Sequence, residues 1–345
     1  MSSTPKAPAS LDRYGPAVRG FMEEVLRGFT LPLYTMERYH LGWVDAKGNP
    51  ETRLGGKGLR STLCLLMVDM LGGRTKQALP AAAALELVHN FSLVHDDIED
   101  RSPQRRYRDT VWKLWGEAQA INVGDSLFTV ARLAMLRLID NDVPASKVVQ
   151  LARMLDESCL RLCEGQYIDL DFQTRADVSE GEYLTMIGGK TAALLSASCE
   201  IGAVLGSADQ RTQGCLKEAG RNLGLAFQIR DDILGLWGEE SSMGKLVGED
   251  LRERKRTIPV ICGLQRARGR DLDAIETIYE GTTPTQQEIS RALAVLEGVG
   301  ARTYAQQMAD QYRKAALAQL RDTGLGNAKV EEFEQLIHFS VERNF

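Results

Sequence analysis

The sequence predicts an all-α fold, a single-domain bundle of roughly ten or more helices around a central cavity. The 345-residue chain is rich in Ala and Leu, whereas aromatic residues make up only 6% of it. Apolar residues recur at helical spacing in one segment after another, with little of the alternation typical of strands. No linker rich in Pro, Ser or charge divides these segments. We therefore expect one domain over residues 11–345, preceded by a disordered leader over residues 1–10.

The predicted helices follow one another along the chain. A first helix over 11–29 precedes a stretch rich in Gly and charge over 40–58, which interrupts the periodicity as a loop does. Gly72 and Gly73 then separate two helices that would otherwise be continuous. Including these two, the further helices are expected over residues 58–71, 79–95, 115–140, 145–169, 179–205, 210–236, 255–266, 286–296, 301–320 and 330–342.

Composition and charge argue against several classes of protein. The formal net charge is −5, and no block of Lys and Arg is long enough for a nucleic-acid footprint or a polybasic membrane anchor. The chain start has no apolar signal-peptide core, and no apolar stretch reaches the roughly 18 residues of a membrane span. The six cysteines show no CxxC spacing, which suits a reducing compartment. We expect a cytoplasmic protein with no nucleic-acid partner and no membrane span.

Two acidic clusters are the most informative feature. DDIED (96–100) and DDILG (231–235) each close an apolar, helix-patterned run. Residues four apart on a helix lie about 40° from each other around the axis, so Asp96 and Asp100 share a face and Asp97 is turned aside. Two such faces meeting across a cavity repel each other by about 4 kcal/mol per close pair. Mg²⁺ between them fits carboxylates that also hold a diphosphate. Either cluster alone is more typical of a solvated helix end.

Cationic patches recur four times along the chain, and three of them contain glycine. The patches are GGKGLR (55–60), the Arg105 and Arg106 pair, IGGKT (187–191) and the segment 244–255 with its two lysine and two arginine residues. Guanidinium groups suit phosphate because each offers a planar fork of donors, and the open N–H groups at a helix start also attract anions. One such patch is usually solvated surface. Four beside two acidic clusters indicate a pocket for two polyanions bridged by metal.

In order and spacing, these motifs resemble the trans-isoprenyl diphosphate synthases, the polyprenyl synthetase family. The matching segments are GGKGLR (55–60), LVHNFSLVHDDIED (87–100), RR (105–106), AINVGDSL (120–127), CEGQYIDL (163–170), GGKTA (188–192), FQIRDD (227–232) and GKLVGEDLRERKRTIP (244–259). The resemblance spans nearly the whole chain. It implies the isoprenoid synthase fold and a Mg²⁺-dependent prenyltransferase that condenses isopentenyl diphosphate with an allylic prenyl diphosphate. By the same analogy we expect a homodimer.

The resemblance also implies a role for each matching residue. Asp96 and Asp100 would hold two of three Mg²⁺ ions, and Asp231 the third. Further contacts to the allylic diphosphate would come from Arg105, Lys190 and Lys245. The contacts to isopentenyl diphosphate would come from Gly56, Lys57, Arg60, His89 and Arg106, and further pocket positions are Thr191, Gln228 and Lys255. Metal ions and cations of this kind stabilise negative charge on a departing diphosphate.

The chain departs from the family pattern at three positions. Gly235 stands where many relatives carry a third aspartate, Tyr107 where they carry glycine, and Trp112 where many have histidine. The last two changes remove no charged contact. Gly235 leaves open a terpene cyclase of the same fold as an alternative to a prenyl synthase. A non-catalytic partner subunit of a prenyl synthase is the other alternative.

The residues before the first cluster bear on product length. Phe91 lies five residues before Asp96, about 7.5 Å back along a helix axis. With Val88 and Ser92 it resembles the wall that limits prenyl chains to farnesyl or geranylgeranyl products, and we expect geranylgeranyl diphosphate. A core aromatic that does not control length is the alternative.

Overall fold

The computed structural model describes residues 8–51, 56, 58–175, 177–238, 247–280, 283–326 and 328–342. Nearly all the regular structure in these ranges is helical, which confirms the predicted all-α bundle. The sheet found there is a two-stranded antiparallel hairpin of β1 (Gln104–Arg105) and β2 (Arg108–Asp109). None of the described helices combines the length and hydropathy needed to cross a membrane.

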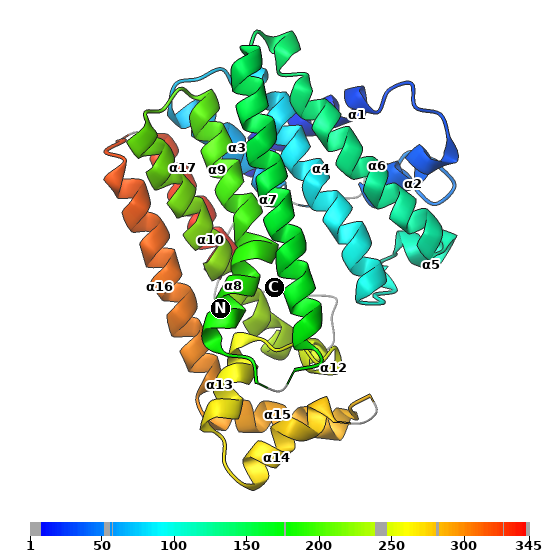
Figure 1. Cartoon of the computed structure of the whole chain (residues 1–345), viewed down its shortest axis with the longest axis vertical. Coiled ribbons are helices and arrows are strands. Elements are labelled where there is room, and N and C mark those ends of the chain that lie inside the picture. The colour runs from blue at the N-terminus through cyan, green and yellow to red at the C-terminus, as the bar shows by residue number, and fades with distance from the viewer. Residues whose placement is uncertain are drawn as a thin grey trace.

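The long helices run side by side through the middle of the molecule, with α16 along one edge and α13 to α15 at one end (Figure 1). The helices are α1 (Ala9–Val25), α2 (Pro32–His40), α3 (Leu59–Met70), α4 (Thr75–Glu99), α5 (Val111–Trp115), α6 (Glu117–Leu136), η1 (Ile139–Asn141), α7 (Ala145–Phe172), α8 (Glu180–Ile187), η2 (Gly188–Ala192), α9 (Ala193–Leu205), α10 (Gln210–Trp237), α12 (Glu249–Arg252), α13 (Ile258–Arg266), α14 (Arg270–Glu276), η3 (Thr277–Tyr279), α15 (Gln286–Gly298), α16 (Ala301–Asp322) and α17 (Ala328–Glu342).

Several predicted boundaries need correction. Helix α1 begins at Ala9 and buries Ser10, so the predicted leader over 1–10 extends two residues too far. Helix α2 was not predicted; it is short, and Pro32 starts it, as proline does in a first helical turn. The helix predicted over 179–205 is divided by η2, a π-helical turn. The short α5 and α14 were also missed.

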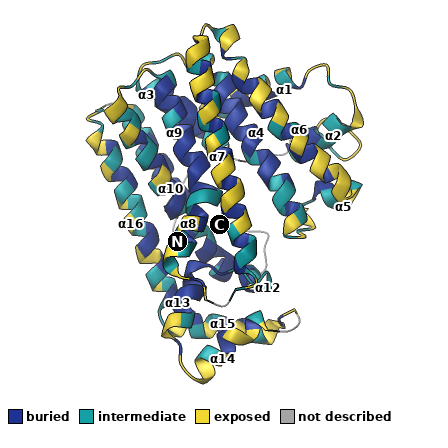
Figure 2. Cartoon of the chain, viewed as in Figure 1, coloured by how far each residue is buried: buried dark blue, intermediate teal, exposed yellow. Residues whose placement is uncertain are grey.

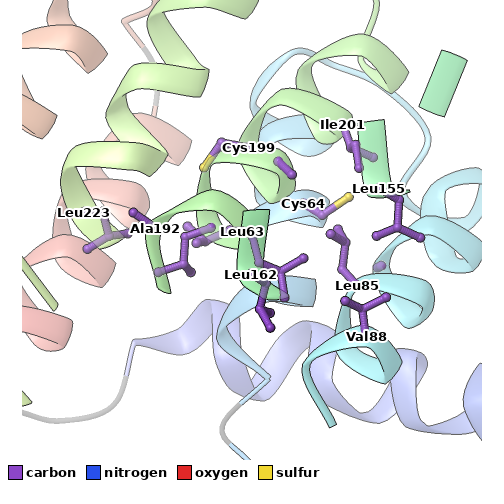
Figure 3. Packing of buried hydrophobic residues seen from close by; sticks show 14 of the residues in the cluster. Leu63, Cys64, Leu85, Val88, Leu155, Leu162, Ala192, Cys199, Ile201 and Leu223 are labelled. Atoms are coloured by element: carbon purple, nitrogen blue, oxygen red, sulfur yellow. The ribbon is translucent and has the colours of Figure 1, made fainter. Parts of the chain in front are cut away.

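The core is built from apolar side chains where α3, α4, α7, α9 and α10 meet. Figure 3 shows Leu63, Leu85, Leu155 and Leu223 among these side chains. Alanines 81–84 of α4 are fully buried, and such small residues let neighbouring helices approach closely. The six cysteines are all free, and four of them are buried. The four buried thiols serve as small core residues rather than cross-links.

Glu37 on α2 is a buried carboxylate without a hydrogen-bond partner. It is 0% exposed, and no donor in the described part of the chain, the nearby Ser126 hydroxyl included, has good hydrogen-bond geometry to either carboxylate oxygen. Burial raises the pKa of Glu37 from 4.5 to about 7, while the Ser126 hydroxyl on α6 and the charge of Arg38 lower it by less. In the unfolded chain the group ionises at lower pH, so this residue reduces stability as pH rises from about 4.5 to about 7.

Replacing Glu37 with Gln should therefore stabilise the protein at alkaline pH. The amide keeps the shape and carries no charge, so we expect the free energy of unfolding to rise by about 2 kcal/mol at pH 8. The gain should shrink as the pH is lowered to 5. Urea unfolding at both pH values measures it, with the exposed Glu331→Gln on α17 as control. A gain in the free energy of unfolding that is equal at both pH values would contradict a raised pKa for Glu37.

Candidate active site

The first acidic cluster forms the end of α4. Asp96 and Asp100 are partly exposed there, whereas Asp97 is only 2% exposed. The carboxylate of Asp97 accepts a hydrogen bond of 2.8 Å from Nε of Arg105. Helical spacing thus divides the cluster, as expected: Asp97 holds Arg105, while Asp96 and Asp100 share another face.

The carboxylate of Asp96 lies where negative charge is disfavoured. Its pKa is raised to about 6, chiefly by burial; Lys190 and Arg105 lower it, and Asp100 and Glu99 raise it further. A carboxylate face that is short of positive charge fits a hard cation such as Mg²⁺. Within the described ranges, no three acidic, histidine or cysteine side chains lie close enough to hold an ion alone. An ion at this face therefore needs other ligands, such as water or diphosphate oxygens.

Lys190 on η2 lies within electrostatic reach of this face. Its Nζ is 2.6 Å from Oδ2 of Asp169 on α7. Burial alone would lower the pKa of Lys190, but Asp169 and then Asp96 raise it above its ordinary value. The ammonium group is therefore charged and held by α7 beside the end of α4.

Two glycines allow α7 and η2 to cross at backbone distance. A Cβ at Gly165 would lie 2.1 Å from the backbone N of Lys190, and one at Gly189 would lie 2.6 Å from the carbonyl O of Arg161. No other residue fits there without a backbone shift. π-Helical turns recur at functional sites, and here the turn carries Lys190 and Thr191. The crossing sets the position of Lys190.

The second acidic cluster lies on α10. Asp232 is 5% exposed and accepts hydrogen bonds from the Tyr183 hydroxyl at 2.5 Å and from Nε2 of Gln228 at 3.0 Å. Gln228 in turn accepts a hydrogen bond of 2.6 Å from Thr191. Burial first, and then the charge of Asp250, raise the pKa of Asp232 to about 8. This network leaves Asp231 as the partly exposed carboxylate of the pair.

Gly235, at the end of this cluster, packs against a carboxylate from another helix. A Cβ at Gly235 would lie 2.2 Å from Oδ2 of Asp250 on α12. The Asp250 carboxylate therefore occupies the space that the side chain of a third aspartate would need. Position 235 thus lacks the third aspartate of many relatives, but the Asp250 carboxylate of α12 lies beside it.

A second group of cations surrounds His89 on α4. A Cβ at Gly56 would lie 2.8 Å from Nη2 of Arg106, so this guanidinium packs against the Gly56 backbone. Burial lowers the pKa of Arg60 to about 10, which leaves it charged at neutral pH, and Asp231 lies within its electrostatic reach. Burial, followed by the charges of Arg60 and Arg106, lowers the pKa of His89 well below its usual value. Two arginines and a neutral imidazole thus lie together.

The other predicted residues lie as follows. Lys255 is partly buried, with Nζ 2.6 Å from Glu253, and lies within electrostatic reach of Asp100. Lys57 and Lys245 fall outside the described residues. Phe91 is 7% exposed, and its ring meets Phe128 of α6 edge-on, with centroids 5.3 Å apart. Val88 is fully buried and Ser92 is 6% exposed.

The residues that hold the cations in place were missed by sequence reasoning. Asp97 and Asp169 pair with Arg105 and Lys190, and Tyr183 supports Asp232. Asp169 was available as a signal, because it lies inside the matching CEGQYIDL segment. Its partner could not be read from the sequence, since the two residues are 21 positions apart and meet only through the helix crossing.

The fold and the site together define an α-helical protein in which two acidic clusters lie close to two separate groups of cationic side chains. The chain belongs to the polyprenyl synthetase family, whose model matches residues 43–321. It is a trans-prenyltransferase that makes short-chain prenyl diphosphates.

Relatives and solved structures agree with this assignment. The geranylgeranyl diphosphate synthase of Mycobacterium tuberculosis strain H37Rv is 40% identical over 292 residues, covering 84% of this chain and 82% of that protein. The (2E,6E)-farnesyl diphosphate synthase of the same strain is 38% identical over 308 residues, covering 88% and 84%. The polyprenyl synthetase of Streptomyces coelicolor A3(2) superposes with a TM-score of 0.87 at 37% identity, covering 96% of this chain and 99% of that chain. A Caulobacter crescentus CB15 polyprenyl synthase complexed with calcium and isoprenyl diphosphate gives 0.86 at 28% identity, covering 99% of both chains.

Proposed function

We propose that the protein uses Mg²⁺ to condense isopentenyl diphosphate with an allylic diphosphate, with geranylgeranyl diphosphate as the product. One observation carries this proposal: two cationic groups of different kinds lie side by side. Lys190 and Arg105 are held by carboxylates next to Asp96 and Asp100. Arg60 and Arg106 surround a neutral imidazole without ion pairs to described residues. The first group suits a metal-bound diphosphate, and the second suits a diphosphate bound without metal.

The acidic residues fit a divalent metal by their chemistry. Asp96, Asp100 and Asp231 offer hard oxygen ligands, and by family resemblance they would hold three Mg²⁺ ions. When bound, the ions neutralise charge on the leaving diphosphate. The calcium in the related Caulobacter structure supports a site for divalent ions in this fold.

The chain's own residues then have distinct tasks. Lys190 and Arg105 donate hydrogen bonds to the allylic diphosphate as its C–O bond ionises. Arg60, Arg106 and His89 hold isopentenyl diphosphate so that its double bond meets the allylic cation. The proton that is then lost goes to the released diphosphate, and the protein supplies no nucleophile. By resemblance, Lys57, Lys245 and Lys255 complete the diphosphate contacts, and Thr191 and Gln228 line the pocket.

An assay with three outcomes tests the proposal. Purified protein is incubated with Mg²⁺, isopentenyl diphosphate and labelled dimethylallyl, geranyl or farnesyl diphosphate. We expect diphosphates lengthened by five-carbon units, and no product when EDTA removes the metal. Volatile hydrocarbons would indicate a terpene cyclase instead, and no product with any starter would indicate a non-catalytic partner subunit.

Product length is tested at Phe91. Its ring lies between α4 and α6 against Phe128. We expect Phe91→Ala to open space for at least one more isoprene unit, so that the main product becomes longer than geranylgeranyl diphosphate. Chromatography of the dephosphorylated products measures the change, with Phe172→Leu, a fully buried α7 aromatic, as a packing control. Unchanged length would assign Phe91 to the core alone.

We infer that the protein is a homodimer that pairs through α6 and α7. In the part of the chain that the structure describes, seven of the eleven exposed large apolar side chains lie on α6, η1 and α7: Ile121, Leu133, Leu136, Ile139, Val149, Leu160 and Tyr167. Figure 2 shows exposed residues along both helices. Between them a hollow of about 430 Å³ is lined in part by Leu136, Val149 and Leu160. An apolar patch of this kind favours a partner surface. Light scattering should give twice the chain mass of 38.2 kDa, and the single mass would exclude the dimer.

A further inference from the structure

The Arg106 guanidinium is presented by a strained turn. Arg106 and Tyr107 link β1 to β2, and both have left-handed backbone angles, with φ of 53° and 59°. Two-residue hairpin turns with both central residues left-handed favour Asn-Gly, because other side chains crowd the backbone there. Each such residue adds steric strain to the backbone. Since neither position is Asn or Gly, contacts outside the turn must hold it.

Arg108, the first residue after the turn, makes those contacts. Its guanidinium donates hydrogen bonds to the carbonyl oxygens of Tyr39 at 3.1 Å and Val44 at 2.8 Å. It also lies 3.3 Å from the Glu51 carboxylate and 3.9 Å above the Tyr39 ring. The side chain is only 14% exposed. Four contacts to α2 and the segment after it therefore converge on one guanidinium.

Each strand of the hairpin is tied to a different helix. On the β2 side, the Tyr39 hydroxyl donates a hydrogen bond of 2.7 Å to the carbonyl oxygen of Asp109. On the β1 side, Arg105 is tied to Asp97 of α4 at 2.8 Å. Arg106 lies between these two attachments and packs against Gly56. It forms no ion pair with any described residue, so its charge is available to an anion.

We propose that Arg108 is a positioning residue for isopentenyl diphosphate. By tying β2 to α2, it keeps the strained turn closed and holds the Arg106 guanidinium beside Arg60 and His89. The inference rests on the proposed function, because it takes Arg106 as a ligand of that substrate. Arg108 itself faces α2 and does not touch the substrate.

The proposal predicts an unequal effect on the two substrates. A lysine at 108 cannot bond two carbonyl groups and cover the Tyr39 ring at once. We expect Arg108→Lys to raise KM for isopentenyl diphosphate about tenfold, because small misplacements of a binding group are costly. KM for the allylic diphosphate and kcat should stay within about twofold. A merely structural role would instead reduce the amount of active enzyme and leave both KM values unchanged.

The strain itself supplies a second test. Glycine at 107 adopts the left-handed conformation at no steric cost, so the turn should then depend less on Arg108. In the Tyr107→Gly background, we expect Arg108→Lys to raise KM for isopentenyl diphosphate only about twofold to threefold. An equal effect in both backgrounds would overturn the link between strain and the Arg108 contacts.

The experiment compares the wild type, the two single variants and the double variant. Arg13→Lys is the matched control, because Arg13 also bonds carboxylates and lies 5.2 Å over a tyrosine ring, but on α1. If Arg108→Lys does not fold, Tyr39→Phe removes only the hydroxyl bond to β2 and should raise the same KM about threefold. Calorimetry measures the binding of isopentenyl diphosphate alongside the kinetics.

The outcomes separate the inference from the proposed function. If the wild-type protein neither binds isopentenyl diphosphate nor makes product, the proposed function and the inference are both refuted. If Arg108→Lys and Tyr39→Phe bind isopentenyl diphosphate as tightly as the wild type does, only the inference is refuted.

Discussion

Replacing Asp96 with Asn should lower kcat about 1,000-fold while the protein stays folded. The amide keeps the shape of the side chain but removes the charge that, on the proposed function, holds a metal ion. A bound metal contributes several kcal/mol to stabilising charge in the transition state, and each 1.36 kcal/mol is a factor of ten in rate. Lys190 and Arg105 would then face the leaving diphosphate without that ion.

Stability separates this effect from misfolding. Asn at 96 removes the repulsion from Asp100 and Glu99 as well as the attraction to Lys190 and Arg105. These changes oppose each other, so we expect Tm to shift by no more than a few degrees. Steady-state rates at saturating Mg²⁺ and substrates measure kcat, with Asp12→Asn on the exposed side of α1 as control. A kcat within tenfold of the wild type would remove Asp96 from the metal site.

The spacing of residues along the sequence predicted those parts of the site that lie within a single helix. Asp96 and Asp100 lie four residues apart, and Asp97 is turned aside to bond Arg105. The order of the motifs also indicated that Lys190, Thr191 and Gln228 belong to one region, and Thr191 does bond Gln228. These features depend on short-range geometry or on motif order, both of which are present in the sequence.

Contacts between distant segments could not be predicted in the same way. The sequence shows that position 235 lacks the aspartate found in many relatives. Only the fold reveals that the Asp250 carboxylate lies against Gly235. The Arg106 and Tyr107 turn is left-handed although neither residue favours that conformation, because Tyr39 and Val44 hold Arg108. Pairing of this kind depends on where helices cross, and hydrophobic periodicity does not encode it.

Gly165 gives the second large expected effect, since Gly165→Ala should destabilise the fold by more than about 3 kcal/mol. The added Cβ would lie 2.1 Å from the N atom and 2.7 Å from the Cα of Lys190. Both are backbone atoms, so no side-chain rotation relieves the overlap, and α7 must move away from η2. Overpacking of this kind costs more than a flexible contact does. Urea unfolding measures the loss.

The matched control is Gly214→Ala on α10. Gly214 is exposed, and a Cβ there would meet nothing within 4 Å. Alanine is the better helix former, so this variant should gain about 0.5 to 1 kcal/mol. The two substitutions should thus change the free energy of unfolding in opposite directions, because only Gly165 lies at the crossing of α7 and η2. Because the same crossing places Lys190 2.6 Å from Asp169, Gly165→Ala should also lower kcat at temperatures where the variant is still folded. Equal effects of the two substitutions on stability would mean that α7 and η2 do not approach as closely as the placement of Lys190 requires.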